Sequence, residues 1–208
     1  MRREEMWAVL DAERASLADL LAELSADEWA HPSLCVGWTV RDVAAHLTLA
    51  PRITVGSALV EITRARGSFN RMVHHTAKRQ ARRPASELVG LMRAAAGSRH
   101  LAPGQKLEDA LMDVLVHGQD ITVPLGRARA MPPDAAVTSA DHLWRMGFPF
   151  HTRRRLAGYR LVATDVGWSA GEGAEVGGPI DALLPLLAGR TATLPRLSGA
   201  GVTALTRT

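Results

Sequence analysis

The sequence predicts a mainly helical protein that ends in a small region of mixed helices and strands. Up to about residue 148, apolar residues recur with the helical period, and capping residues precede several of these stretches. Beyond that point a short alternating segment, YRLVATD, lies among glycine-rich turns. We therefore expect a helical bundle over residues 1–148 and a small α+β domain over residues 149–208.

The N-terminal region is predicted to be a series of amphipathic helices. Residues 2–24 carry leucines near the helical period, and the segment DEWAHPSLCVGW then breaks the pattern. A second helix begins at Thr39, where TVRD forms a short capping box with Asp42. The other predicted helices cover residues 53–66, 68–82, 85–97, 106–120 and 134–147, with a loop at 98–105.

The C-terminal region is predicted to contain a strand, a turn and a helix. YRLVATD, residues 159–165, alternates as a strand does, and GWSAGEG follows as a glycine-rich turn. AEVGG is then expected to pair back as a hairpin. PIDALLPLLAGR predicts a helix that begins at Pro179 and ends at Gly189, and the remaining tail is expected to be irregular.

Composition limits the classes of function. The chain has 208 residues, 47% of them hydrophobic, and no apolar run approaches the roughly 18–20 residues of a membrane span. The charged N-terminus lacks a signal-peptide pattern, so we expect a cytoplasmic protein. The single cysteine, Cys35, excludes an internal disulfide and a cysteine-based zinc site. We expect its side chain to be a small buried apolar group.

The charge pattern does not favour a nucleic-acid partner. The formal charge is +4, and the sequence pI of about 10.1 reflects an arginine-rich composition. Basic residues cluster in residues 64–83, but Phe69 is the one aromatic there and no nucleic-acid-binding motif is present. We interpret this stretch as a solvated face. The alternative, a nucleic-acid interface, predicts steeply salt-dependent binding.

The helix predicted at 106–120 concentrates polar residues on one face. Five of them lie within about 40° of the stripe's centre at about 100° per residue: Lys106, Asp109, Asp113, His117 and Asp120. Apolar residues border this polar stripe on both sides, while Glu108 and Gln119 could form a wet face elsewhere. The polar stripe is therefore either solvated or turned inward, where charges need partners or a metal.

Asp113 and His117 are four residues apart, which is close enough on a helix to bind one cation. A catalytic zinc site usually takes three protein ligands and leaves one position open. His46 differs from the other histidines because it lies on a helix with apolar neighbours. It follows Asp42 by four residues, so Asp42 could hydrogen-bond its second ring nitrogen. Spacing alone leaves open whether these are metal ligands or ordinary core residues.

Two segments carry a specific signal in combination: GWTVRDVAAHL at 37–47 and DVLVHGQDITVPLG at 113–126. Together they resemble the mycothiol-dependent maleylpyruvate isomerase family of DinB-like four-helix bundles. RLVATDVGWSAGEG, LAGR and LSGAGV resemble that family's smaller C-terminal part. The resemblance implies a divalent metal, typically zinc, on His46, Asp113 and His117. Position 113 is Asp here, where the characterised isomerase pattern has Glu.

The resemblance also implies the chemistry of an enzyme. A metal-bound thiol ionises readily, and the expected cosubstrate is mycothiol or a similar thiol. Its attack on an electrophilic small molecule gives S-transfer if the adduct remains, or cis–trans isomerisation if the thiolate leaves after bond rotation. The alternative is a non-catalytic metal- or small-molecule-binding DinB-like module, since Asp113 departs from the pattern. We expect a monomer or homodimer.

Further polar residues are candidates for supporting roles. Asp120 could hydrogen-bond His117 as a second-layer acid, or could contact exposed backbone near the helix end. Arginine suits the carboxylate and hydroxyl groups of such ligands. Four arginines are candidates by position, each with a solvated surface role as its alternative: Arg82, Arg83, Arg153 and Arg154. Trp38 is expected to pack at the start of the helix that carries His46.

Overall fold

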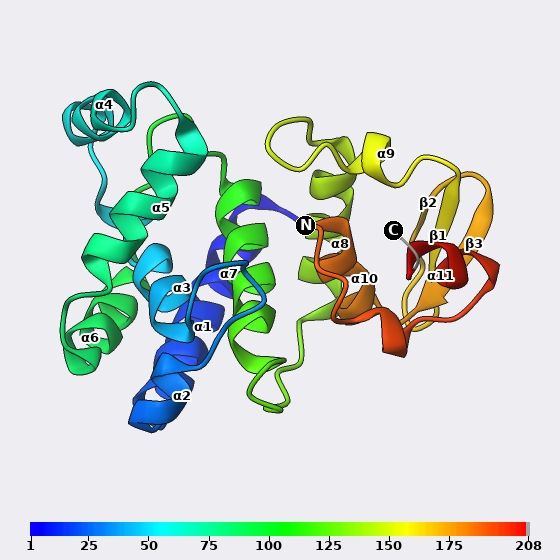
Figure 1. Ribbon diagram of the computed structural model, residues 1–208, viewed down its shortest axis with the longest axis horizontal. Coiled ribbons are helices and arrows are strands. Elements are labelled where there is room, and N and C mark those ends of the chain that lie inside the picture. The colour runs from blue at the N-terminus through cyan, green and yellow to red at the C-terminus, as the bar shows by residue number, and fades with distance from the viewer. Residues whose placement is uncertain (207–208) are drawn as a thin grey trace. The chain divides into compact units, whose positions relative to one another are not determined.

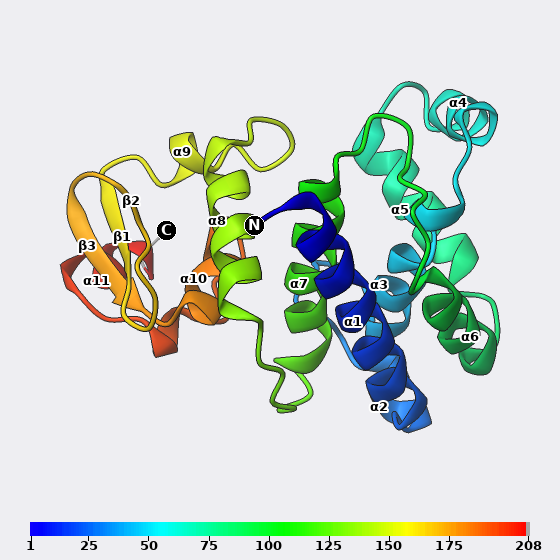
Figure 2. The same ribbon diagram turned by 180° about the vertical axis from the view of Figure 1, so that it is seen from behind.

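The computed structural model describes residues 1–206, and the chain forms two compact units. One spans Arg2–Arg129 and the other runs from Ala130 onward. Helices predominate in both (Figures 1 and 2), so the mainly α fold class is confirmed. Among residues 1–206, every helix falls short of the length and apolar character that a bilayer span requires.

The unit Arg2–Arg129 is a four-helix bundle with additional short helices. Its four bundle helices are α1 (Arg3–Ala22), α3 (Val40–Leu47), α6 (Ala85–Ala95) and α7 (Leu107–Thr122). Helices α1 and α3 each pack against both α6 and α7, which closes the bundle. Fully buried leucines fill its interior, each contributing about 1.5–3 kcal/mol: Leu10, Leu17, Leu88, Leu111 and Leu115.

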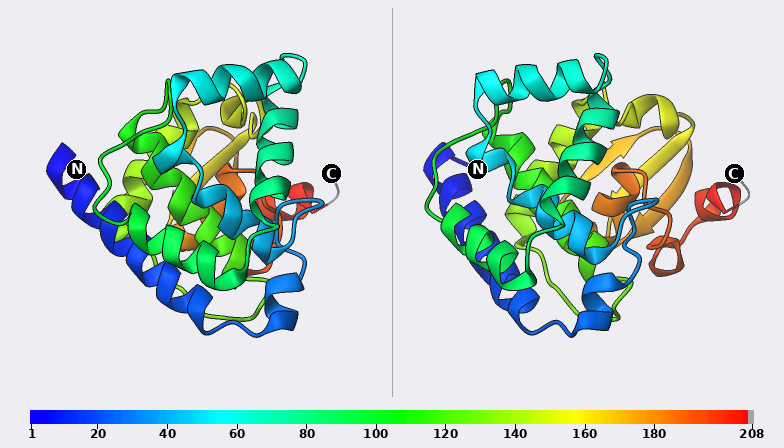
Figure 3. Two further views of the ribbon diagram at one scale, coloured as in Figure 1. Left: turned by 90° about the vertical axis from the view of Figure 1, so that its left-hand side faces the viewer. Right: turned by 60° about the vertical axis from the view of Figure 1, so that its left-hand side comes forward.

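The remaining helices of this unit flank the bundle. Helix α5 (Phe69–Gln80) packs along α3, and α4 (Val55–Arg64) lies across the start of α5 (Figure 3). A 3₁₀ turn, η1 (Ala50–Arg52), precedes α4. Helix α2 (Ala26–Ala30) falls where the sequence predicts a break. Its start is fixed locally, because the Ser25 hydroxyl accepts the Glu28 N–H and the Glu28 carboxylate accepts the Ser25 N–H.

The sheet of the second unit corrects the predicted hairpin. Strands β1 (Tyr159–Ala163), β2 (Ser169–Gly171) and β3 (Ala174–Gly178) have the order β2-β1-β3. The predicted turn GWSAGEG supplies β2, which pairs antiparallel with β1. β3 pairs with the other edge of β1 and is parallel to it. The chain turns back between β2 and β3 at glycines with positive φ, so β3 again runs in the direction of β1.

The other elements of this unit are the helices α8 (Pro133–Arg145), α9 (Thr152–Arg155), α10 (Ile180–Leu187) and α11 (Ala200–Leu205), with a 3₁₀ turn, η2 (Leu194–Arg196). Helix α10 packs against β1 and α8, and α8 packs against α9. The tail predicted to be irregular thus includes α11. This helix packs against β3, where a Cβ at Gly201 would lie 2.9 Å from the Ala174 oxygen. The missing side chain therefore permits the approach.

The compact units divide before α8 rather than after it. Helix α8 packs against α10, so it belongs with the C-terminal unit in the structure. The domain boundary predicted after residue 148 stays a prediction about which part folds independently. Its difference from the structural division has a simple cause: the helical pattern of residues 134–147 says nothing about which neighbours the helix packs against.

Candidate metal centre

The start of α3 positions His46. The Thr39 hydroxyl accepts the Asp42 N–H, and the Asp42 carboxylate accepts the Thr39 N–H at 2.8 Å, as the predicted capping box requires. Val43 and Leu47 bury their side chains in the bundle. His46 lies in the last turn of the helix, and its ring centroid is 5.0 Å from that of His117 on α7.

Three potential ligands from these two helices meet at one point. The His46 Nε2 atom lies 3.7 Å from Asp113 Oδ2, and the His117 Nε2 atom lies 3.3 Å from Asp113 Oδ1. One ligand atom from each residue lies within 4.8 Å of the others. The three side chains are 13–25% exposed, so solvent or a small molecule can reach them. The shorter Asp side chain at position 113 therefore still reaches both imidazoles.

The cluster is electrostatically coupled. Burial would raise the pKa of Asp113, but the charge of His117 and hydrogen bonds from both imidazoles lower it well below its usual range. Burial would lower the pKa of His117, but Asp113, Asp120 and Cys35 raise it well above the usual value. The carboxylate is thus held ionised between two imidazoles, and a divalent cation could take the place of the His117 proton.

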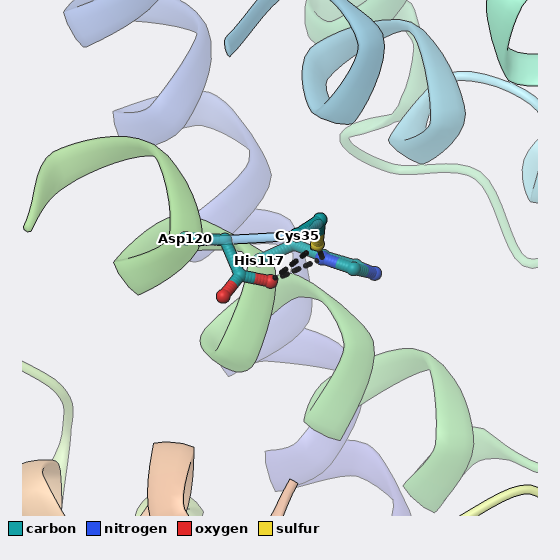
Figure 4. A group of neighbouring side chains, drawn as sticks. All are labelled: Cys35, His117 and Asp120. Carbon is teal, nitrogen blue, oxygen red and sulfur yellow. Dashed lines mark hydrogen bonds and ion pairs between the residues drawn. The ribbon is translucent and has the colours of Figure 1, made fainter. Parts of the chain in front are cut away.

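The other ring nitrogen of His117, Nδ1, faces the side chains of Asp120 and Cys35 (Figure 4). Its Nδ1 atom lies 2.8 Å from Oδ2 of Asp120, whose residue is 0% exposed. The Cys35 Sγ donates to the same oxygen at 3.1 Å and lies 3.7 Å from Nδ1. The Leu34 N–H donates to the Asp120 backbone oxygen, which ties this loop to α7. Cys35 is half-buried and polar in its contacts, so its expected role as a buried apolar group is corrected.

Two overlapping groups therefore offer metal-ligand atoms around one imidazole: His46, Asp113 and His117, or Cys35, His117 and Asp120. A hydrogen bond between Nδ1 and Asp120 fixes the tautomer that leaves a lone pair on Nε2. That lone pair faces Asp113. The arrangement thus favours His46, Asp113 and His117 as the metal ligands. Asp120 takes the predicted role of hydrogen-bonding His117.

Asp42 is placed differently from the prediction. Its carboxylate accepts hydrogen bonds from Thr39 and from the Lys78 Nζ at 2.7 Å, and forms none with His46 among the described residues. Burial would raise the pKa of Asp42, but Lys78 and Thr39 lower it. A spacing of four residues made a contact with His46 plausible, but the capping geometry turns the carboxylate toward the start of the helix.

Aromatic contacts hold His46 instead. Trp38 lies edge-on to the His46 ring, with centroids 5.5 Å apart. The Trp38 indole N–H donates to His74 Nδ1 at 3.0 Å, so this histidine is not simply solvated as its basic neighbourhood suggested. Trp38 does pack at the start of α3. Its contact with His46 was not predicted, because nothing in the local pattern links residues 38, 46 and 74.

The polar stripe of α7 is turned inward along much of its length. Asp113, His117 and Asp120 meet the groups described above, and α7 continues to Thr122, beyond its predicted end. Gln119, predicted to be on a wet face, is 4% exposed and donates to the Arg129 oxygen. The helix is therefore buried around most of its circumference, which is why its charged residues need partners.

The predicted ligand-binding arginines have varied surroundings. Arg83 donates to Gln80 and pairs with Glu87, while Arg82 is exposed. Arg153 and Arg154 are exposed on α9, in the other compact unit. Their binding of a thiol or substrate stays a prediction. In the basic stretch, Lys78, Arg64 and Arg79 pair with acidic side chains, which weakens the case for a phosphate-binding face.

The fold and the cluster define a class: a helical-bundle protein with two histidines and a carboxylate, from two helices, grouped as metal ligands. Residues 10–110 match the family model of the mycothiol maleylpyruvate isomerase N-terminal domain. Residues 10–110 are therefore similar to that domain, and the resemblance predicted from the sequence is confirmed over this part of the chain.

Solved structures share the fold. A crystal structure described as the mycothiol-dependent maleylpyruvate isomerase matches with a TM-score of 0.67 and 14% identity, covering 97% of this chain and 94% of that chain. A structure described as a histidine-to-alanine mutant of the mycothiol-dependent maleylpyruvate isomerase matches with a TM-score of 0.64, at the same identity and coverage. No curated protein sequence matches this chain.

Proposed function

We propose that this protein is a metal-dependent enzyme that activates a low-molecular-weight thiol, mycothiol or a similar compound, for attack on an electrophilic small molecule. The observation that carries the proposal is the meeting of His46, Asp113 and His117 at one partly accessible point. The domain family and the shared fold support the thiol and the reaction class. We propose a cytoplasmic setting, as the sequence suggests.

The donor set suits zinc or a similar divalent ion. Two imidazole nitrogens and one carboxylate match the three-ligand sets of catalytic zinc sites, which keep a further position open. The spacings of 3.3 and 3.7 Å between carboxylate oxygens and imidazole nitrogens allow all three to approach a common ion with small side-chain adjustments. Both imidazoles must be neutral to bind, so metal binding displaces the proton of His117.

When bound, the cation supplies a Lewis acid that lowers the pKa of a thiol into the physiological range. The protein's own residues prepare the site. Asp120 accepts the Nδ1 proton of His117 and fixes the ring, and Trp38 holds the His46 ring from its edge. Such supporting contacts keep the ligand atoms in place without reorganisation.

The thiol then attacks the electrophile by ordinary conjugate addition. A sulfur–carbon bond forms, and the π electrons of the double bond move toward the conjugated carbonyl. Rotation about the resulting single bond and expulsion of the thiolate give the cis–trans isomer with no net consumption of thiol. Retention of the sulfur–carbon bond, with protonation of the carbanion, gives S-transfer. Isomerisation is the better supported of the two, because both matching crystal structures are described as an isomerase.

The test combines metal analysis with turnover. We expect wild-type protein purified without chelator to hold about one zinc per chain, and the His46→Ala and His117→Ala variants to lose it. His75→Ala is a matched control, since His75 is exposed on α5 outside the cluster. Thiol-dependent isomerisation of cis-configured unsaturated acids should follow the metal. If both His46→Ala and His117→Ala retain the metal, the proposed metal site is wrong. If the wild type holds metal but shows no turnover at any thiol concentration, the protein is the non-catalytic metal-binding module instead.

A further inference from the structure

Polar side chains of α5 hold the start of α3 and the loop before it. The Lys78 Nζ atom donates to the Gly37 oxygen at 3.0 Å and to the Asp42 carboxylate at 2.7 Å. One turn earlier on α5, the His74 Nδ1 atom accepts the indole N–H of Trp38 at 3.0 Å. Because residues four apart lie on the same face of a helix, one face of α5 contacts this segment at three points.

The backbone of the loop fixes the position of Trp38 and leaves the direction of its ring to the side chain. The Trp38 oxygen accepts the Ser33 backbone N–H and the Ser33 hydroxyl, each at 2.9 Å, and the Trp38 backbone N–H donates to the Cys35 oxygen at 2.9 Å. The half-buried indole has one polar atom, its N–H, which needs an acceptor. His74 supplies this acceptor, so the bond selects the direction of the ring.

The direction of the Trp38 ring matters because this ring lies against His46. Their ring centroids are 5.5 Å apart and the interplanar angle is 64°, which is an edge-on contact. The other histidine of the cluster, His117, has its ring fixed by a hydrogen bond to Asp120. A metal-binding imidazole needs a contact of this kind to keep its orientation. His74 therefore reaches the candidate metal centre through one intervening side chain.

We propose that His74 is a positioning residue, which sets the orientation of the His46 ring through its hydrogen bond to the Trp38 indole. In terms of the proposed function, on which this inference rests for its consequence, the orientation directs the His46 Nε2 atom toward the position shared with Asp113. The ring contact itself is a property of the metal-free protein.

The first test uses metal-free full-length protein and NMR spectroscopy, with Trp38→Phe to identify the Trp38 indole signal among five tryptophans. In the wild type we expect nuclear Overhauser effects between the Trp38 and His46 rings. His74→Leu, which lacks an acceptor, should weaken them and shift the indole N–H signal upfield. His74→Asn should retain both, because its amide oxygen can accept the indole N–H in place of Nδ1. His75→Leu is the matched control, since His75 is the exposed neighbour on α5.

The second test measures zinc affinity by competition with a chelator. His74→Leu should lower the affinity about tenfold, the lower end of the effect of residues that support a metal ligand, and His74→Asn should restore most of it. In the Trp38→Phe background, which lacks the indole N–H, His74→Leu should cause no further loss. This double-mutant cycle separates an action through Trp38 from an independent effect of His74.

Unchanged Overhauser effects in His74→Leu overturn the inference, because the loop alone would then hold the Trp38 ring. An equal loss of zinc affinity with and without the indole N–H, or no loss in His74→Leu, also overturns it. If the wild type binds no zinc, the proposed function fails, and the comparison of metal-free proteins decides the role of His74. If His74→Leu does not fold, His74→Ala takes its place, since it also lacks an acceptor.

Discussion

The polar stripe on α7 has two parts that contain similar residue types but have different roles. At the start of the helix, the Asp109 carboxylate accepts the Lys106 backbone N–H at 2.7 Å and both residues remain partly exposed. Further along, Asp113, His117 and Asp120 meet side chains from α3 and from the loop before it. Both groups lie on the same face of the helix, so the difference between them comes from the chain segments that pack against each part of it. Local capping serves the first group, and long-range packing creates the second.

Removal of His117 should have the largest effect on this contrast. His117→Ala is expected to weaken zinc binding by more than about a hundredfold, because loss of a mere supporting residue already costs about 10–100-fold. Competition with a chromogenic chelator measures the affinity. Asp109→Ala, on the same stripe, should bind zinc as the wild type does. An equal loss of zinc affinity in His117→Ala and Asp109→Ala would contradict the division of the stripe into a capping part and a metal-binding part.

Asp120→Asn should come next. The substitution keeps the shape at a fully buried position but weakens the acceptor for the Nδ1 proton of His117. Zinc affinity should fall by about 10–100-fold while the α-helical circular dichroism spectrum stays unchanged. An unchanged affinity would assign Asp120 to the stability of the helix alone.

Asp109→Ala should affect stability rather than binding. Loss of the Asp109 contact to the Lys106 N–H is expected to lower the free energy of unfolding by about 0.5–2 kcal/mol, as loss of a helix cap does. Urea denaturation of the metal-free protein measures this change. If Asp109→Ala leaves stability unaltered, the start of α7 is fixed by packing and not by its cap.

Cys35→Ser should have the smallest effect. A serine hydroxyl can still donate to Asp120, so zinc affinity should remain within a few-fold of the wild type. Cys35→Val removes the donor and should cost about 0.5–1.5 kcal/mol in stability. Loss of stoichiometric zinc in Cys35→Ser would instead indicate a metal bound on the Nδ1 side of His117, by Cys35 and Asp120.

Much of this architecture follows from local sequence patterns. The α3 capping box, the Ser68 start of α5 and the Pro179 start of α10 all lie where the residues predicted them. These signals act within one helical turn, so a single sequence contains them. Strand direction is different: AEVGG has no residue that distinguishes parallel from antiparallel pairing, and the pairing is decided by the turn before it.

The site shows the same limit. The i, i+4 spacing placed Asp113 and His117 together, but His46 could be joined to them only through the resemblance of two motifs. Asp42 satisfied the same spacing rule with His46, yet its carboxylate is engaged by Thr39 and Lys78. The contacts of Cys35 with His117 and Asp120 depend on a chain segment more than 80 residues away in sequence, so no local pattern could indicate them.

X-ray absorption spectroscopy at the zinc edge tests the central claim most directly, because it distinguishes the two sides of His117. On zinc-loaded protein prepared without thiol buffers, we expect nitrogen and oxygen neighbours at about 2.0–2.2 Å, including two imidazoles, and no sulfur. This is the ligand set of His46, Asp113 and His117. A sulfur neighbour at about 2.3 Å that disappears in Cys35→Ser would contradict the account and place the metal against Cys35 and Asp120.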